Sequence, residues 1–173
     1  MHTDNLNTPR ATQRDALSTQ ALTPNEGVKD TAMTEIFGEP ISVYTRAQAI
    51  EDGQLIDMSA TAREAGIVWP VALTAAAWAD CVAWTDADEK RKGYTGQSES
   101  GRLWDVCWML SRVVLRAARH GLQATPAHPM YVELLRTPRE GRGVRPRLAH
   151  LKFIVGSDDG GRPVITVMLP GED

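Results

Sequence analysis

The strongest hydrophobic pattern in the chain runs over residues 98–120 and repeats with a helical period. When these residues are projected at about 100° each, apolar side chains cover well over half of the helix circumference. So broad an apolar arc is typical of a central helix that other elements contact from several sides, and Gly121 directly after it is a stop signal. The narrow remaining face carries five charged side chains: Arg102, Asp105, Arg112, Arg116 and Arg119.

Trp104 and Trp108 lie one turn apart, at the margin between the apolar arc and the arginines. We expect both rings to form part of the wall of the core, with arginine stems packed over them. The alternative is that rings and arginines are exposed together, a composition typical of protein interfaces.

The C-terminal third has a strand pattern instead. Residues 130–137, 148–155 and 164–169 are predicted strands, and the Ser, Asp and Gly residues at 157–161 predict a turn between the last two. Together they predict a three-stranded antiparallel meander with one face against the long helix.

Between residues 41 and 84 the pattern predicts short helices that alternate with extended segments of a few residues. Thr45 and Gln48 form a capping box, Ser59 is a second N-cap, and Pro70 is a first-turn residue of a third helix that runs to about residue 84. The expected fold is therefore α+β, with several short N-terminal helices and one long central helix packed on a C-terminal three-stranded antiparallel meander. The predicted extended segments are 41–44, 55–58 and 67–69, and the predicted helix stops are Gly53 and Gly66.

Residues 1–32 are polar and contain no aromatic side chain. Such a segment buries too little apolar surface to offset the entropy of ordering it. We therefore expect a disordered tail over residues 1–32 and a single α+β domain over residues 33–173, with Met33 as an alternative start. The alternative for the tail is a short helix over residues 12–21 that docks on a partner.

Composition narrows the classes of function. A formal charge of −3 and a pI of about 5.8 argue against a dedicated nucleic-acid binder. Cys81 and Cys107 lack the spacing of a metal site and are predicted to be buried, reduced thiols. We expect no cofactor and no metal, and we interpret the charged residues 85–97 as a connection that is either a solvated turn or a helical turn with its charges suited to the helix dipole. Since the sequence has no signal peptide and no apolar run long enough to cross a bilayer, a cytoplasmic location without membrane contact is expected.

The most basic segment of the chain lies between the first two predicted strands. A Gly- and Pro-containing loop of this kind can fold around phosphate or carboxylate groups. Its simpler interpretation is a soluble hairpin tip. The candidate partner-binding residues are therefore the loop arginines Arg136, Arg139, Arg142, Arg145 and Arg147, together with Arg112, Arg116 and Arg119 of the helix.

Motifs of known catalytic sites are absent: the chain has no GxSxG, Walker, GxGxxG or HExxH sequence. His150 and Glu133 could face each other across paired strands, and Asp57 could join them as an acid–base site. Isolated His and Glu side chains are common on the wet face of a sheet, so we assign no catalytic residue.

Several short motifs resemble the start of an uncharacterised bacterial family. They are FGEPI at residues 37–41, YTRAQA at 44–49, LID at 55–57, AREAG at 62–66 and PVALT at 70–74, followed by Trp78. A looser match continues through residues 102–119 and the C-terminal hairpin. Members of that family occur on phages, plasmids and integrative elements. The resemblance implies a mobile-element setting and supplies no catalytic or binding residues.

We therefore expect a non-enzymatic accessory or anti-defence protein of a mobile element. It would bind a host protein or protein complex, with anti-CRISPR inhibition as a specific case. One alternative is a nucleic-acid-associated protein that contacts the backbone through the arginine-rich loop. A second alternative is a small enzyme with the His/Glu/Asp site. The sequence leaves the oligomeric state open.

Overall fold

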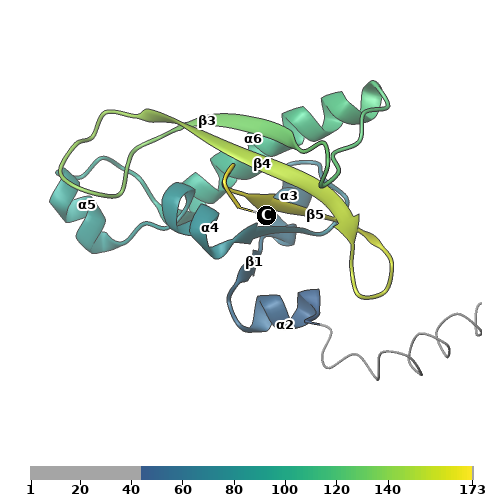
Figure 1. Ribbon diagram of the computed structural model, residues 1–173. Coiled ribbons are helices and arrows are strands. Elements are labelled where there is room, and N and C mark those ends of the chain that lie inside the picture. The colour runs from purple at the N-terminus through teal and green to yellow at the C-terminus, as the bar shows by residue number, and fades with distance from the viewer. Residues whose placement is uncertain (1–43, 173) are drawn as a thin grey trace, which may run out of the picture. The chain divides into compact units, whose positions relative to one another are not determined.

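A computed structural model describes residues 44–172 of the chain (Figure 1). The expected tail over residues 1–32, the alternative start at Met33 and most of the extended segment 41–44 lie outside the described residues. The helices are α2 (Arg46–Glu51), α3 (Ser59–Glu64), α4 (Ala75–Cys81), α5 (Asp86–Lys92) and α6 (Glu99–Arg119). The strands are β1 (Leu55–Asp57), β2 (Val71–Thr74), β3 (Met130–Arg136), β4 (Arg147–Ser157) and β5 (Pro163–Met168).

All five strands form one mixed sheet in the order β1-β2-β5-β4-β3. The β3-β4-β5 part is antiparallel throughout, as the sequence predicts. β1 and β2 extend it, with β2 parallel to β5 and antiparallel to β1. The expected fold of N-terminal helices on a three-stranded meander is therefore wrong, because two of the segments before α6 belong to the sheet.

The main cause of this error is the segment after Pro70, which we expected to continue as a helix. Val71–Thr74 is a strand, and Thr74 then caps α4 by accepting a hydrogen bond from the backbone N–H of Ala77. Val71, Ala72 and Leu73 are fully buried, and β1 and β5 pair with the two edges of the strand. A run of consecutive apolar residues is typical of such a central strand, but over so short a length it also fits a helix.

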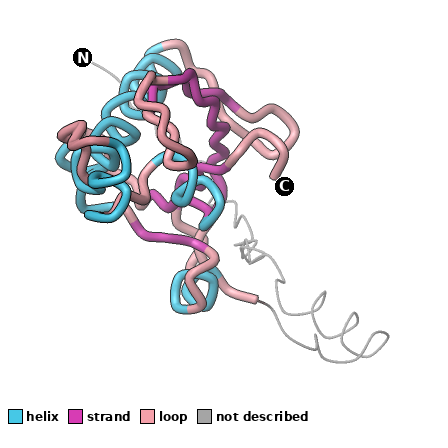
Figure 2. The backbone as a smooth tube through the Cα atoms, turned by 90° about the vertical axis from the view of Figure 1, so that its left-hand side faces the viewer, coloured by secondary structure: helices cyan, strands magenta, loops and turns pink. Residues whose placement is uncertain are grey.

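The core lies between one face of the sheet and the helices α3, α4 and α6. Figure 1 shows α6 crossing behind β3 and β4, and Figure 2 shows the strands, in magenta, beside the helices, in cyan. The sheet supplies alternate side chains, so that Val132, Leu151 and Phe153 face inward while Tyr131 and His150 face solvent. Val106, Cys107 and Leu110 of α6 are buried against them.

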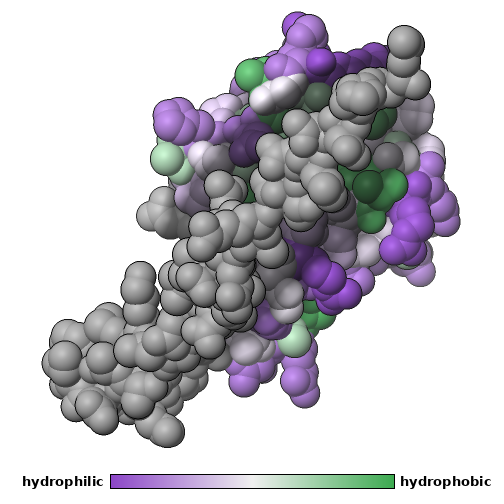
Figure 3. Space-filling model, turned by 90° about the vertical axis from the view of Figure 1, so that its right-hand side faces the viewer, coloured by the Kyte–Doolittle hydropathy of each residue, from purple (hydrophilic) through white to green (hydrophobic). Residues whose placement is uncertain are grey.

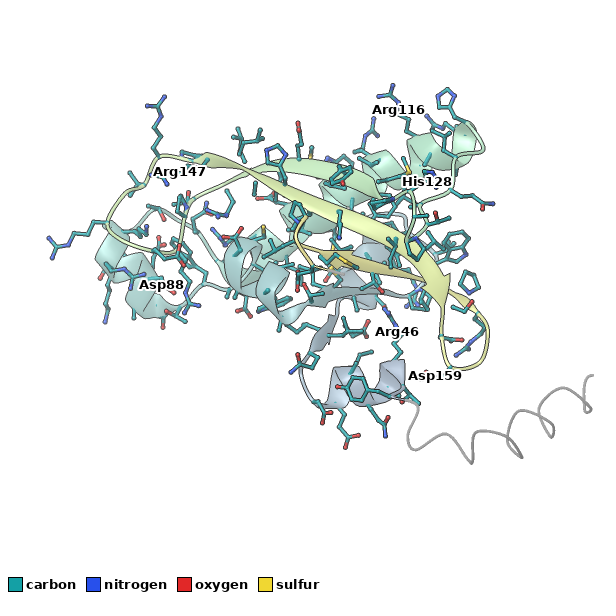
Figure 4. All side chains as sticks on the ribbon, in the orientation of Figure 1. Arg46, Asp88, Arg116, His128, Arg147 and Asp159 are labelled. Carbon is teal, nitrogen blue, oxygen red and sulfur yellow. The ribbon has the colours of Figure 1, made fainter. Side chains whose placement is uncertain are left out.

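α2 is attached to the turn between β4 and β5. The predicted Thr45–Gln48 capping box is confirmed. The carboxylate of Asp159 accepts hydrogen bonds from the backbone N–H groups of Arg46 and Ala47, at 3.0 and 3.2 Å. The Arg46 guanidinium reaches β5, where it donates to the hydroxyl of Thr166 at 2.9 Å (Figure 4). A residue more than a hundred positions away thus satisfies donors that the first turn leaves free.

Two further local expectations can be compared with the structure. Of the two interpretations of residues 85–97, the helical one is confirmed: residues 86–92 form α5, because Thr85 and Asp88 make a second capping box and Gly93, at φ 78°, ends the helix in the left-handed region. Ser59 begins α3 without capping it; instead its own N–H donates to the carboxylate of Asp57 at 3.0 Å. Across residues 44–172, none of the helices is both long and apolar enough to cross a membrane.

The sheet register can be tested through Phe153. We expect Phe153→Ala to lower the free energy of unfolding by about 3–5 kcal/mol, since the ring is fully buried between the sheet and α6. Leu135→Ala on the outer face should cost less than about 1 kcal/mol, because this side chain is exposed. Urea unfolding followed by circular dichroism measures both. Equal losses would contradict the assignment of the inner face.

Candidate functional site

An apolar strip made of Trp104, Trp108 and Leu115 is exposed along α6. Trp104 is 38% exposed, Trp108 is 47% exposed and Leu115 is 39% exposed. The two indole rings stack, with centroids 6.2 Å apart and planes inclined by 22°. The expectation that these rings form the core wall is therefore wrong, and the exposed alternative describes them. The expected packing of an arginine over a ring is confirmed at Trp108. We call Trp104, Trp108 and Leu115 the α6 strip.

Helix geometry explains why the strip stays outside the core. Its three residues project within about 40° of one another. On one side of the strip, the next residues around the helix circumference are Ser111 and Cys107, and both are buried. The apolar arc of α6 is thus wider than the surface that the sheet, α3 and α4 can cover, and its uncovered margin is the strip.

Three arginines lie along the other side of the strip. The guanidinium carbon of Arg112 lies 5.9 Å from the centre of the Trp108 ring, within cation–π range. Arg112, Arg116 and Arg119 are exposed, and within residues 44–172 none of them makes an ion pair. With Val113 and Leu115 they line a pocket of about 320 Å³, which we call the arginine pocket.

An apolar groove of about 360 Å³ adjoins the C-terminal half of α6. Figure 3 views the side of the molecule on which α6 ends, and hydrophobic residues, in green, are visible there among hydrophilic ones. Leu115 lines both the groove and the arginine pocket, so the two adjoin at this side chain. The groove walls and floor include Val68, Trp69, Leu115, Leu122, Met130, Phe153 and Val155.

Sequence analysis did not single out Val68, Trp69 and Leu122 at the groove rim. A signal was present: Val68 and Trp69 are large apolar residues in a loop that Pro70 prevents from being helical. Leu122 likewise follows the helix stop at Gly121, at φ 64°. Large apolar side chains in loops on both sides of a long helix are candidates for a common surface.

Arg102, which the projection places among the polar residues of α6, is buried and has a structural role. Its guanidinium donates to the backbone carbonyls of Val82 and Thr137 at 3.1 and 2.9 Å, and to that of Asp80 at 3.3 Å. It also lies 4.8 Å from the centre of the Trp84 ring. Burial lowers the pKa of Arg102 from its ordinary value. These contacts satisfy carbonyls at the end of α4 and directly after β3, so Arg102 is not available to a partner.

The predicted arginine loop is docked on α5 instead of extending freely. Arg91 donates to the carbonyls of Arg139 and Gly141 at 2.8 and 3.2 Å. The ammonium of Lys92, itself buried, donates to those of Glu140 and Gly143 at 2.9 and 2.8 Å. Backbone carbonyls of the loop are thus bound by side chains of α5.

Ion pairs neutralise two of the predicted loop arginines. Arg136 makes a two-point contact with the carboxylate of Asp80. Arg139 donates to buried Asp88 at 2.9 Å, and Asp88 also pairs with Arg91 (Figure 4).

The other three loop arginines, Arg142, Arg145 and Arg147, are exposed. In the described part of the chain they make no ion pair. The five predicted loop residues therefore divide into two that hold the loop in place and three that face solvent.

The candidate acid–base site does not assemble. His150 and Glu133 do pair across β4 and β3, with Nδ1 and Oε1 3.3 Å apart, but both side chains are more than half exposed. Asp57 lies on β1, three strand spacings or about 14 Å from β4, and binds Ser59. Neither described pocket includes any of the three. Among residues 44–172, no cluster of three His, Cys, Asp or Glu side chains could hold a metal ion.

The fold and the surface of α6 define an α+β protein with exposed tryptophans and arginines on its longest described helix. Residues 33–173 match a family described as "Family of unknown function (DUF6573)", and the chain belongs to this family. No curated protein and no solved structure matches the chain. The family description gives no activity, so function is argued from the surface itself.

Asp88 provides a test of the loop attachment through pH. Hydrogen bonds from Thr85, together with those from Arg91 and Arg139, outweigh the burial of this carboxylate and hold its pKa well below the usual range. A lowered folded-state pKa adds stability above the unfolded value of about 3.9, and this stability is lost as the pH falls below it. We expect Asp88→Asn to lower the urea midpoint at pH 7 and to flatten the loss of stability below about pH 4.

Asp86→Asn is the matched control, because Asp86 is exposed on the same helix. Its urea midpoints should stay close to those of the wild type at both pH values. If the urea midpoint of Asp88→Asn at pH 7 equals that of the wild type, the ion pairs of Asp88 with Arg91 and Arg139 do not stabilise the fold.

The two thiols should react slowly. The expectation that Cys81 and Cys107 are buried and unpaired is confirmed. Burial raises the pKa of Cys81 to about 11 and that of Cys107 to about 12, so little thiolate forms at pH 8. A disulfide reagent should label the native protein at least about 100-fold more slowly than the urea-unfolded chain. Rapid labelling of either thiol in the native state would contradict the burial.

Proposed function

We propose that this protein is a non-enzymatic accessory protein that binds another protein through the α6 strip and its arginines. The observation that carries the proposal is the exposed pair of stacked rings of Trp104 and Trp108, continued by Arg112 over Trp108. Tryptophan and arginine are the side chains most enriched among the residues that dominate binding energy at protein interfaces.

The physical cost of this surface supports a binding role. Each exposed indole holds apolar area that water solvates unfavourably, at about 25 cal/mol per Å². The exposed apolar residues are also grouped, since the strip leads through Leu115 into the groove. Grouped apolar surface with a charged rim is typical of sites that a partner covers.

The biological setting of the proposal, a mobile genetic element, comes from the resemblance to a protein family whose members occur on phages, plasmids and integrative elements. In that setting the partner is a host protein or protein complex, and the activity is accessory or anti-defence, with anti-CRISPR inhibition as a specific case. A cytoplasmic location fits such a partner. These finer statements rest on the resemblance alone.

One observation favours a second candidate function, contact with a nucleic-acid backbone. Arg142, Arg145 and Arg147 face solvent from a loop that α5 holds in place, so their charges are pre-positioned. Binding dominated by phosphate contacts should weaken steeply between about 50 and 200 mM salt. Salt-independent binding to DNA or RNA would exclude this role.

Affinity capture from host cells tests the first proposal. The bait is the full chain, as wild type and as the Trp104→Ala/Trp108→Ala double variant. Tyr131→Ala is the matched control, because Tyr131 is a similarly exposed aromatic residue on the outer face of the sheet. Loss of two interface residues of this kind at about 2 kcal/mol each should weaken binding of the partner about 1,000-fold, while the control should capture normally.

The captured partner is then confirmed by titration of the purified components with each variant. If Trp104→Ala/Trp108→Ala binds the partner as tightly as the wild type, the strip is not the contact surface. A parallel measurement of unfolding shows that the double variant is folded, which the exposure of both rings leads us to expect.

A further inference from the structure

We propose that the groove and the arginine pocket together bind one amphipathic helix of a partner protein. The apolar side of this helix enters the groove and continues along the α6 strip, and its acidic side chains meet Arg112, Arg116 and Arg119. The inference rests on the proposed function and names the chemistry of the partner.

The groove offers its occupant mostly side chains, since Met130 is its only lining residue from the edge strand β3. Met130 and Phe153 on its floor are paired with each other in the β3–β4 ladder. The backbone N–H of Val155 donates to the carbonyl of Ala124 at 2.8 Å. A peptide strand would find only one residue of an edge strand within the groove lining, whereas a helix satisfies its own backbone and needs only apolar contacts.

The rim requires an occupant larger than the groove. Val68 and Leu122 are 79% and 58% exposed, and Trp69 beside them is also exposed. A small ligand inside the groove would leave these side chains and the two indole rings of the strip in water. A helix lying over the groove and along α6 covers all of them at once.

The charge on one side of the strip selects an acidic partner. Arg112, Arg116 and Arg119 follow one another at spacings of four and three residues, so they form a row of about 10 Å along one side of α6. Among residues 44–172 no carboxylate pairs with them. Glutamates spaced three or four residues apart on a facing helix match this row, and lysines at the same positions would be repelled.

The length of the surface sets the length of the helix. From Trp104 to Leu115 the strip covers eleven residue rises, about 16 Å, and the groove continues beyond Leu115. A helix of about 18 residues, or about 27 Å, spans both. Its apolar anchors would recur at three- and four-residue intervals.

Three synthetic peptides of about 18 residues test the proposal against the full chain. The first is an amphipathic helix with leucines on one side and glutamates along its flanks. The second has the same composition in scrambled order, which removes the apolar side. The third replaces every glutamate with lysine.

The readout is the indole N–H signals of the ¹⁵N-labelled protein. We expect the first peptide to shift the signals of Trp69, Trp104 and Trp108 saturably. Trp84 should stay unchanged, because its ring is buried and its indole N–H donates to Glu89 at 2.8 Å. Scrambled and lysine peptides should bind at least about tenfold more weakly.

Arginine variants test the acidic contact. Arg116→Glu/Arg119→Glu should lower the affinity for the first peptide at least about tenfold. The lysine peptide should bind this variant more tightly than it binds the wild type. Lys90→Glu/Arg162→Glu is the matched control, since both cations are exposed and line neither the groove nor the arginine pocket. It should leave the affinity unchanged.

Several results would overturn the inference. These are equal binding of the acidic and lysine peptides, shifts confined to the β3–β4 face, or no shift with any peptide. Tighter binding of dodecanoate than of the acidic peptide would identify a small amphiphile as the occupant. Tryptophan shifts that depend on protein concentration alone would identify a second copy of the chain.

Failure of the inference is distinct from failure of the proposed function. If Trp104→Ala/Trp108→Ala loses the captured partner while no peptide binds, the strip is an interface and its partner is not an acidic helix. If the acidic peptide binds the groove while capture is unaffected by that variant, the helix site exists and the proposed function through the strip is wrong.

Discussion

The parallel pairing of β2 with β5 is the contact on which the rest of the structure depends. It joins a strand from before α6 to the last strand of the chain, so that the two halves share one sheet. β1 pairs with the other edge of β2, and Val71 and Leu73 of β2 are fully buried in the core. Parallel strands need a long crossover, and here the whole segment from α4 to β4 provides it. The position of α6 across the sheet follows from this connection.

The same pairing decides which part of α6 remains uncovered. A helix with an apolar arc over more than half of its circumference would be enclosed if elements surrounded it. In this fold the sheet, α3 and α4 cover only the side with Val106, Cys107 and Leu110. The margin with Trp104, Trp108 and Leu115 faces solvent and leads into the groove. The candidate binding surface is thus the part of a normal helix core face that this fold leaves without a partner.

The arginines divide in the same way between structure and surface. Arg102 and Arg136 bind buried carbonyls and Asp80, and Arg139 binds Asp88, so these charges hold α4, α5 and the loop together. Arg102 and Asp88 are buried, and leaving either charge without its partner is costly, which makes these contacts part of the fold. The arginines of the pocket have no such partner among residues 44–172 and remain available for binding. Residue type alone does not separate the two groups.

The sequence by itself determined the elements whose signals are local. The capping box at Thr45, the extent of α6 and the β3-β4-β5 meander follow from side chains within a few residues of one another. The pairing of His150 with Glu133 follows from strand alternation in the same way. Only the tertiary structure decided that Val71–Thr74 is a central strand, that Arg102 is buried and that the indole rings are exposed. Each of these depends on which distant segment packs alongside. Hydrophobic periodicity identifies the apolar face of a helix or strand, but it does not identify the segment that covers this face.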